Sequence, residues 1–140
     1  MTVYLDTSVI IALIAEEPAS ETVRNWFRNA TERMIVSDLV RLEFSAFVSR
    51  AVRTKRFDAH QAAVALRRFD ALRKSCDALE HTARDFSRAE ELIREFAMKL
   101  AAPDALHLAS VLAAKTSLLT LDMRLREAAR LSAIMPIVVP

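Results

Sequence analysis

The chain has 140 residues, of which 53% are hydrophobic, and it carries a formal net charge of +2 and a single cysteine. This length suits one domain with a sizeable core, so we expect a single domain over residues 1–140. One cysteine excludes an internal disulfide framework and a cysteine metal cage, and no apolar run reaches the roughly 20 residues of a membrane-spanning helix. With no signal peptide before the first predicted strand, we expect a cytoplasmic protein.

Predicted strands and helices alternate along the chain. Strands are predicted at residues 2–5, 34–36, 78–81, 118–121 and 137–139. Helices are predicted at residues 9–15, from 18 past 27, from 37 or 38 to 53, from 58 to 74, from 82 past 96, from 103 onward, and at 123–131. This alternation predicts an α/β sandwich with a mostly parallel central sheet.

Local signals support several of the predicted helix starts. Ser37 and Asp38 can cap the helix that follows them, and Asp58 stands three residues before Gln61 in the spacing of a capping box. Pro103 suits the first turn of a helix, where its missing N–H costs nothing. The chain has no glycine, which argues against a phosphate-binding loop or a dinucleotide-binding fingerprint.

Four acidic residues stand at distinctive places in this pattern. Asp6 follows the first strand, Asp122 follows the strand predicted at 118–121, Asp104 opens a strongly apolar helix, and Glu43 interrupts an apolar helical face. Because the carboxyl ends of parallel strands share one sheet edge, folding is expected to bring these carboxylates together. Such a cluster is costly unless a cation neutralises it, and hard divalent cations take oxygen ligands. The sequence therefore predicts a metal-dependent site.

Three of these acids also have a purely structural interpretation. Asp6 and Asp122 could cap the helices that follow them, and Asp104 could interact with the positive end of a helix dipole. Thr7 and Ser8 add hydroxyl groups beside Asp6, which could cap the same helix or orient a carboxylate or a phosphate. The prediction of a metal site therefore rests on the four acidic residues taken together and not on any one of them.

Glu43 has large apolar neighbours one helical turn away, so it is expected to project toward buried surface. The alternative to a metal-facing role is a salt bridge to Arg41 or Arg50.

His107 lies on a helix that is apolar all round and is interpreted as a buried, hydrogen-bonded structural residue rather than a ligand. Cys76 has no identifiable base for a nucleophilic role.

The distribution of charged residues is more informative than the net charge of +2. Removing the four site acids from the total of 18 leaves 14 acidic against 20 basic side chains, or +6, and 16 of the basic residues are Arg. Arg binds phosphate through a planar fork of donors, so a basic surface around an acidic pocket suits a phosphodiester substrate. The alternative is that the Arg content reflects a GC-rich genome.

Four motifs, in this order, resemble those of PIN-domain ribonucleases, specifically the VapC-type toxins of type II toxin–antitoxin pairs. The resemblance covers essentially the whole chain. This sequence departs from the family pattern at one place, the loop at residues 100–102, which lacks a glycine often found there in relatives. None of the expected metal ligands is missing because of this difference. The motifs are Tyr4-Leu5-Asp6-Thr7-Ser8-Val9, Leu42-Glu43, Pro103-Asp104-Ala105-Leu106-His107-Leu108-Ala109 and Thr120-Leu121-Asp122.

The resemblance implies a PIN-like α/β/α sandwich and an endoribonuclease dependent on Mg²⁺ or Mn²⁺. Water would attack an RNA phosphodiester in line and leave a 5′-phosphate and a 3′-hydroxyl. Asp6 and Asp104 would be the principal metal ligands. Asp122 would complete the metal shell or hold a second ion, and Glu43 would act through a coordinated water. The residues implied to orient these carboxylates are Thr7, Ser8 and Thr120.

The resemblance also implies a homodimer and a cognate antitoxin protein whose tail covers the acidic cleft, with no membrane association. Trp26-Phe27 and the segment 44–48 are plausible contact surfaces, with ordinary core packing as the alternative. The RNA path could be lined by Arg50, Arg53, Lys55 and Arg56.

Two other functions fit parts of the sequence. A non-catalytic RNA-binding or regulatory PIN domain would need no metal, but acids in an RNA-binding cleft repel phosphate unless a cation is bound. A phosphohydrolase with Asp6 as the nucleophile would need a second acid two positions later, where this chain has Ser8.

Overall fold

A computed structural model describes residues 1–133 and 136–137 of the chain. Its core is one all-parallel sheet with the strand order β3-β2-β1-β4-β5. The strands are β1 (Thr2–Leu5), β2 (Arg33–Ser37), β3 (Asp77–Leu79), β4 (Ser117–Leu119) and β5 (Pro136–Ile137). The predicted α/β class with a parallel sheet is confirmed.

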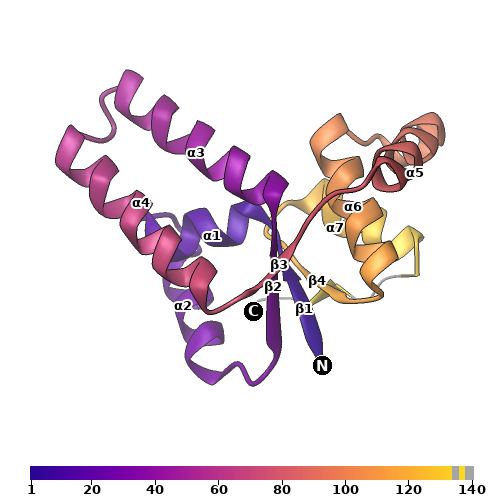
Figure 1. The fold of residues 1–140 in the computed structure, drawn as a ribbon, viewed down its shortest axis with the longest axis horizontal. Coiled ribbons are helices and arrows are strands. Elements are labelled where there is room, and N and C mark those ends of the chain that lie inside the picture. Colours follow the sequence, from indigo (N-terminus) through magenta and orange to yellow (C-terminus); the bar gives the residue numbers. More distant parts are fainter. Residues whose placement is uncertain (134–135, 138–140) are drawn as a thin grey trace.

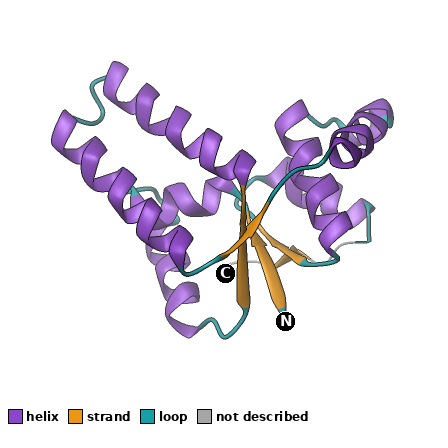
Figure 2. Cartoon of the chain, in the orientation of Figure 1, coloured by secondary structure: helices purple, strands orange, loops and turns teal. Residues whose placement is uncertain are grey.

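Helices cover the sheet in two groups, as Figures 1 and 2 show. The first group lies to the left of the sheet in Figure 1 and contains α1 (Thr7–Ile14), α2 (Ser20–Asn29), α3 (Asp38–Arg53) and α4 (Ala59–Lys74). The second group lies to the right and contains α5 (Ala83–Arg94), the short 3₁₀ helix η1 (Phe96–Met98), α6 (Ala102–Ala114) and α7 (Met123–Leu131). This is the three-layer arrangement that the sequence predicted.

The strand order reverses beside the central strand. From β1 the chain moves outward to β2 and β3, and it then crosses through α5 and α6 to β4 on the other side of β1. The first residue after β1 is held against β4, because the Asp6 N–H donates to the Leu119 carbonyl at 3.0 Å. Ligands of open α/β folds bind at such a reversal, outside the carboxyl ends of the strands.

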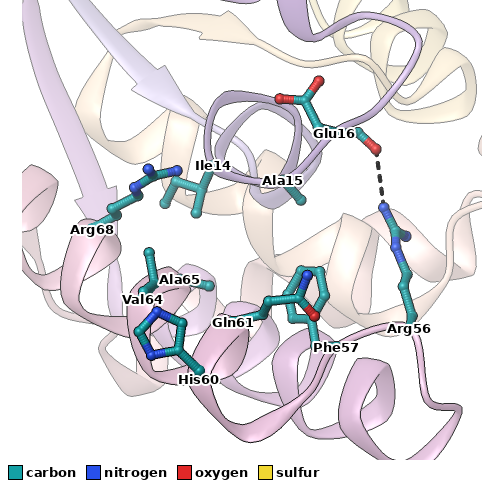
Figure 3. Close-up of a pocket in the computed structure, with 10 residues that line it drawn as sticks. All are labelled: Ile14, Ala15, Glu16, Arg56, Phe57, His60, Gln61, Val64, Ala65 and Arg68. Atoms are coloured by element: carbon teal, nitrogen blue, oxygen red, sulfur yellow. Dashed lines mark hydrogen bonds between the residues drawn. The ribbon is translucent and has the colours of Figure 1, made fainter.

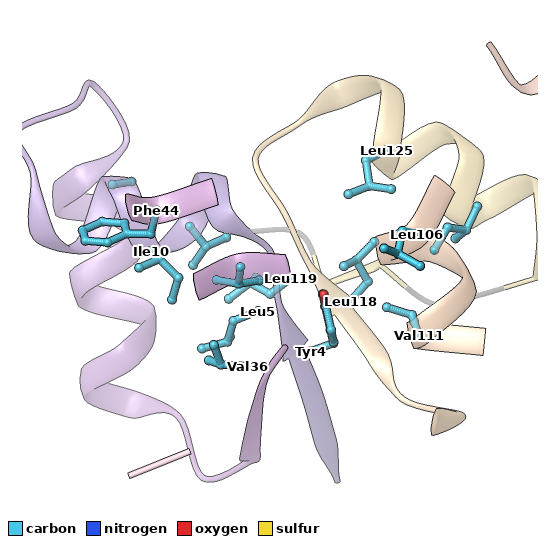
Figure 4. Close-up of a cluster of buried hydrophobic side chains, with 14 of the residues drawn as sticks. Tyr4, Leu5, Ile10, Val36, Phe44, Leu106, Val111, Leu118, Leu119 and Leu125 are labelled. Carbon is cyan, nitrogen blue, oxygen red and sulfur yellow. The ribbon is translucent and has the colours of Figure 1, made fainter. Parts of the chain in front are cut away.

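Side chains of β1 alternate between the two faces of the sheet, as the period of a strand requires. Figure 4 shows Leu5 on one side with Ile10, Val36 and Phe44, and Tyr4 on the other side with Leu118 and Val111. Of the segments predicted as possible contact surfaces, Phe44 and Phe47 are buried in the core, and Trp26 and Phe27 are partly buried against it. Core packing therefore accounts for most of these aromatic side chains.

The capping signals are confirmed. The Ser37 hydroxyl accepts from the Val40 N–H at the start of α3. Asp58 and Gln61 form both bonds of a capping box at α4, at 2.7 and 2.9 Å. Pro103 lies in the first turn of α6.

Several predicted boundaries were wrong for identifiable reasons. Helix α1 begins at Thr7, because the Asp6 side chain caps it. Strand β4 ends at Leu119 rather than residue 121, because the hydroxyls of Ser8 and Thr120 accept the N–H groups of the two residues before α7. Strand β2 is longer by a residue at each end, the strand predicted at 78–81 is Asp77–Leu79, and α2 begins at Ser20. Residues 138–139 of the predicted last strand lie outside the described residues.

The apolar pattern predicted to continue through residue 96 also required correction. Helix α5 ends at Arg94, and Phe96 lies in η1 with 85% of its surface exposed. Ala89 and Leu92 form the buried part of the pattern, whereas Phe86 is largely exposed. Among the described residues, none of the helices combines the length and apolarity needed to cross a membrane.

Asp58→Ala removes the acceptor of the α4 capping box without touching the cleft at the sheet edge. We expect the free energy of unfolding to fall by about 0.5–2 kcal/mol in urea titrations, because an N-terminal N–H loses its partner. Asp58→Asn keeps a side-chain oxygen at this position and should retain most of the stability. Equal stability of the Ala variant and the wild-type protein would contradict this role of the cap.

Candidate functional site

All four predicted acidic residues line one cleft of about 420 Å³ at the carboxyl edge of the sheet. Asp6 comes from the end of β1, Glu43 from α3, Asp104 from the first turn of α6, and Asp122 from the cap of α7. The other residues that line the cleft are Thr7, Ser8, Ile11, Ala46, Phe47, Arg50, Arg53 and His107. The topology thus brings together side chains that lie up to 116 positions apart in the sequence.

Asp6 is buried and held on both of its oxygens. Its Oδ1 accepts from the Thr7 N–H at 2.7 Å, and its Oδ2 accepts from the hydroxyls of Ser8 at 2.6 Å and Thr120 at 2.8 Å. A carboxylate offers about four acceptor sites, so these three bonds orient Asp6 and leave capacity for one further ligand. The helix-cap interpretation of Asp6 is correct and is compatible with ligand binding.

Glu43 is bound by donors from two other helices. Its Oε2 accepts from the Thr7 hydroxyl, and the His107 Nε2 lies 2.8 Å from the same oxygen. The alternative salt bridge to Arg41 is wrong, because Arg41 pairs with Asp38 at 2.6 Å. Within the described part of the chain, neither Arg50 nor any other Arg forms an ion pair with Glu43, and its Oε1 accepts no hydrogen bond. That oxygen remains available in the cleft.

His107 is buried and hydrogen-bonded, as the sequence predicted, but its position in the acidic cluster was missed. Besides Glu43, its Nε2 lies 3.4 Å from Asp6 Oδ1. One ligand-type atom each from Asp6, Glu43 and His107 lie within 4.8 Å of one another, which makes this trio a possible cation site. The signal available in the sequence was the spacing of three residues from Asp104, which places both side chains on the same side of α6.

Behind His107 lie two more polar groups, Tyr4 and Ser37, whose connection to the cleft the sequence analysis missed, although it had identified Ser37 as a helix cap. The Tyr4 hydroxyl lies 2.7 Å from His107 Nδ1 and 2.6 Å from the Ser37 hydroxyl. All three side chains are at most 1% exposed. The alternation of β1 was a usable signal, because Tyr4 is two residues before Asp6 and points to the same face.

Asp104 and Asp122 are half-buried, and the charge of Asp122 acts on Asp104. Burial raises the pKa of Asp104, and the negative charge of Asp122 raises it further, with smaller contributions from Asp6 and Glu43. Asp122 also caps α7, since its Oδ1 accepts from the N–H groups of Arg124 at 2.7 Å and Leu125 at 3.1 Å. A cation bound beside Asp104 would favour its ionised form and so oppose this shift.

Glu43 and His107 stabilise each other's charged forms. Burial opposes ionisation of Glu43, but the hydrogen bond and the charge of His107, together with the Thr7 hydroxyl, lower its pKa. Burial likewise opposes protonation of His107, yet the hydrogen bond to Glu43 and the charges of Asp6, Glu43 and Asp104 raise its pKa. Cys76 lies outside the cleft, and burial raises the pKa of its thiol, which fits the absence of a nucleophilic role.

The donor set fits a hard divalent cation. The cleft offers carboxylate oxygens from four elements, and the pKa of one of these carboxyl groups is raised in part by the others. Oxygen-rich sites of this kind suit Mg²⁺ or Mn²⁺, which bind through one or two carboxylates and retain several waters. Of the residues placed here by the sequence, Asp6, Glu43, Asp104 and Asp122 supply the oxygens. Thr7, Ser8 and Thr120 hold two of these carboxylates, Asp6 and Glu43, in place.

A separate cavity of about 600 Å³ lies between the end of α1 and the start of α4, as Figure 3 shows. Ile14 lines it from α1 and Phe57 from the segment before α4, and Arg56 donates to the Glu16 carbonyl at 3.2 Å across one side. Glu16 is the acidic residue that lines it, so this cavity lacks the oxygen cluster of the sheet edge.

Comparison with known families decides how these residues are interpreted. A family model of the PIN domain matches residues 3–131, which include all four acids of the cleft. The chain belongs to the PIN-domain family. A comparison with curated protein sequences found no match.

Solved structures share this PIN fold over nearly the whole chain. FitAcB from Neisseria gonorrhoeae has a TM-score of 0.76 at 17% identity and covers 97% of this chain and 96% of its own. VapC20 from Mycobacterium tuberculosis, described as a Sarcin-Ricin loop cleaving toxin, has a TM-score of 0.74 at 18% identity with 99% coverage of both chains. VapBC2 from Rickettsia felis, bound to a promoter DNA fragment, has a TM-score of 0.70 at 19% identity with 98% coverage of both. At these identities the likeness establishes the fold.

The raised pKa of Asp104 predicts a pH-dependent effect of Asp104→Asn on stability. Since the fold favours the protonated acid, the contribution of Asp104 to the wild-type free energy of unfolding falls as pH rises from the ordinary Asp pKa, about 3.9, through the raised value. The Asn variant cannot ionise at this position. In urea titrations with EDTA, its stability relative to wild type should therefore increase between about pH 3.5 and pH 7.

Asp70→Asn, on the exposed side of α4, is the matched surface control for this comparison. If the cleft binds Mg²⁺, adding the ion at neutral pH should stabilise the wild-type protein more than Asp104→Asn, because the variant lacks one carboxylate of the cleft. A stability difference that is the same at every pH would contradict the placement of Asp104 in an acidic, half-buried cleft.

Proposed function

We propose that this protein is an endoribonuclease dependent on Mg²⁺ or Mn²⁺ and the toxin of a toxin–antitoxin pair. One observation carries the proposal, namely the four carboxylates gathered in one cleft at the strand-order reversal of a PIN domain. Carboxylates alone repel an RNA phosphate, so the cleft becomes useful to a nuclease when a divalent cation reverses its charge.

In this proposal Asp6 and Asp104 are the principal metal ligands, Asp122 completes the shell or holds a second ion, and Glu43 acts through a coordinated water. Asp6 retains one acceptor site beyond its three short bonds, and the Oε1 of Glu43 lies free of protein partners among the described residues. When bound, the ion would lower the pKa of a water and offset charge on the phosphoryl oxygens.

Thr7, Ser8 and Thr120 orient these carboxylates. Ser8 and Thr120 fix Asp6 Oδ2, and they also accept the backbone N–H groups of Leu121 and Asp122 at 3.0 Å each. The same two hydroxyls therefore set the turn that carries Asp122 into the cleft. Mutation of a group that orients a metal ligand typically lowers metal affinity by about 10- to 100-fold.

RNA as the substrate is supported by the basic residues beside the acids. Arg50 and Arg53 lie two and three turns beyond Glu43 on α3 and line the same cleft. Within the described residues, neither takes part in an ion pair, whereas Arg41 and Arg56 on either side of them do. We assign them to the phosphates that flank the scissile bond, because their guanidinium groups are free to bind.

An antitoxin partner is supported by the toxin–antitoxin complexes among the structures with this fold, such as those from Klebsiella pneumoniae and Salmonella typhimurium. We propose that the partner's tail covers the acidic cleft, and that the active toxin is a homodimer. Cleavage must therefore be measured on protein separated from any partner.

A PIN domain that binds RNA without cleaving it is the main alternative. It would gain nothing from four acids in the RNA-binding cleft, and neutralising them should strengthen binding. An Asp6 nucleophile is disfavoured because Ser8, which replaces the second acid of such enzymes, donates to Asp6.

Purified protein should cleave structured RNA in Mg²⁺ or Mn²⁺ and should lose this activity in EDTA. Asp6→Asn and Asp104→Asn should each lower the rate by at least about 100-fold, because the ion and its water are no longer held. Asp70→Asn, a surface carboxylate on α4, should cleave at the wild-type rate. Cleavage that persists in both cleft variants, or RNA binding that tightens without any cleavage, would overturn the nuclease assignment.

Arg50→Ala combined with Arg53→Ala should weaken RNA binding uniformly across RNA sequences. With cleavage blocked by Asp104→Asn in every protein, the slope of log affinity against log salt should fall by about 0.7–0.9 for each phosphate that the two arginines neutralise in the wild-type protein. Arg94→Ala is the matched control, because the Arg94 side chain pairs with Glu90 on α5, away from the cleft. An unchanged salt slope in the double variant would show that RNA passes elsewhere.

A further inference from the structure

A buried chain of side-chain hydrogen bonds runs from the start of α3 to the acidic cleft. It begins where the Val40 N–H donates to the Ser37 hydroxyl at 3.3 Å. It continues from Ser37 to Tyr4 at 2.6 Å and from Tyr4 to His107 Nδ1 at 2.7 Å. It ends at Glu43 Oε2, 2.8 Å from His107 Nε2. This series of hydrogen bonds thus links the cap of α3 to β1, then β1 to α6, and finally α6 back to α3.

The groups in this series of hydrogen bonds lie in apolar surroundings. His107 is flanked on α6 by Ala105, Leu106, Leu108 and Ala109, all of them buried. A polar ring among such neighbours is costly unless both of its nitrogens are hydrogen-bonded. Tyr4 and Ser37 are completely buried, so their hydroxyls also depend on partners inside the protein. The arrangement is therefore a set of mutually dependent groups.

The direction of donation follows from what each group faces. Nε2 of His107 faces oxygens of Glu43 and Asp6, at 2.8 and 3.4 Å, so this nitrogen must carry a hydrogen. For a neutral His107, one arrangement gives every buried hydrogen an acceptor: Ser37 donates to Tyr4, Tyr4 donates to Nδ1, and Nε2 donates to Glu43. A charged imidazolium would donate from Nδ1 to Tyr4, and the Ser37 hydrogen would then have no acceptor among the described residues. A nitrogen that carries a hydrogen has no lone pair for a metal ion.

We propose that Tyr4 and Ser37 are positioning residues that act through His107, holding its Nε2–H on Glu43 Oε2 so that Glu43 Oε1 faces the metal in the cleft. His107 then orients an acidic residue of the site and is not itself a ligand, although its atoms lie within ligand range of Asp6 and Glu43. Thr7 holds the same oxygen of Glu43 from α1. The inference rests on the proposed metal site, and it adds residues on the far side of His107 that never touch the ion.

Tyr4→Phe tests the proposal by removing one hydroxyl from the chain. In ¹⁵N-labelled protein, wild-type His107 should show the Nε2–H tautomer, and this signature should be lost or mixed in Tyr4→Phe, with His60 and His81 as internal references. Mn²⁺ affinity measured by calorimetry should fall by about 10- to 100-fold, as expected when a group that orients a ligand is removed. Ser110→Ala, which removes another buried hydroxyl from α6, should leave Mn²⁺ affinity within about twofold of wild type.

Substitution of His107 separates orientation from ligation. His107→Gln keeps an N–H donor near the Nε2 position, whereas His107→Leu keeps none, so Gln should retain more Mn²⁺ affinity than Leu. Ser37→Ala interrupts the same series of hydrogen bonds at its other end, while also removing the α3 cap, and it should weaken Mn²⁺ binding in the same direction. Folding of every variant is checked by thermal unfolding before affinities are compared.

Two results would overturn the proposal. The first is a folded Tyr4→Phe protein with wild-type Mn²⁺ affinity and an unchanged His107 tautomer. The second is a wild-type Nε2 resonance that shifts on Mg²⁺ binding as a directly coordinated nitrogen does. If the wild-type protein bound no Mn²⁺, the proposed function itself would fail. If it bound Mn²⁺ and cleaved RNA while Tyr4→Phe behaved identically, only this inference would fail.

Discussion

Repulsion among carboxylates at one sheet edge is the constraint on which the arrangement of this site depends. Two unit charges 4 Å apart repel by about 4 kcal/mol at an effective dielectric constant near 20, so a PIN domain that gathers four acids must hold them by other means. It does so with donors: Asp6 accepts from a backbone N–H and two hydroxyls, and Glu43 accepts from Thr7 and His107. Burial, and after it the negative charges of Asp122, Asp6 and Glu43, raise the pKa of Asp104, so this is the acid whose ionisation a bound cation would favour.

The fold supplies these donors at little extra cost because its topology brings them to the same place. The strand order reverses between β1 and β4, so the residues that end these strands meet, and the hydroxyls of Ser8 and Thr120 can serve Asp6 and the turn before α7 together. Helices α1, α3 and α6 begin or pass at the same edge and contribute Thr7, Glu43 and His107. The geometry of the site and the local backbone structure thus rely on the same hydrogen bonds, and a change in either should be felt in the other.

The sequence was sufficient to predict the parallel α/β fold, the helix caps and the gathering of all four acids, because strand ends and apolar helical faces leave local patterns. It was insufficient where long-range contacts decide. Strand β4 was predicted too long because side-chain hydroxyls compete for its N–H groups. The only protein partners considered for Glu43 were nearby Arg residues, whereas its partner His107 lies 64 positions away. Tyr4 was predicted only as a strand residue and Ser37 only as a helix cap, since no local pattern shows that their hydroxyls bond to each other across 33 positions.

The position of a bound divalent ion is the most direct test of this site. Crystals grown with Mn²⁺ and measured near its absorption edge would locate the ion by anomalous scattering. We predict a peak in the cleft, coordinated directly by Asp6 and Asp104, with Glu43 Oε1 reaching it through water and His107 Nε2 still hydrogen-bonded to Glu43. A protein that holds no ion in this cleft, or one whose ion is ligated by His107 in place of Asp104, would contradict the proposed metal site.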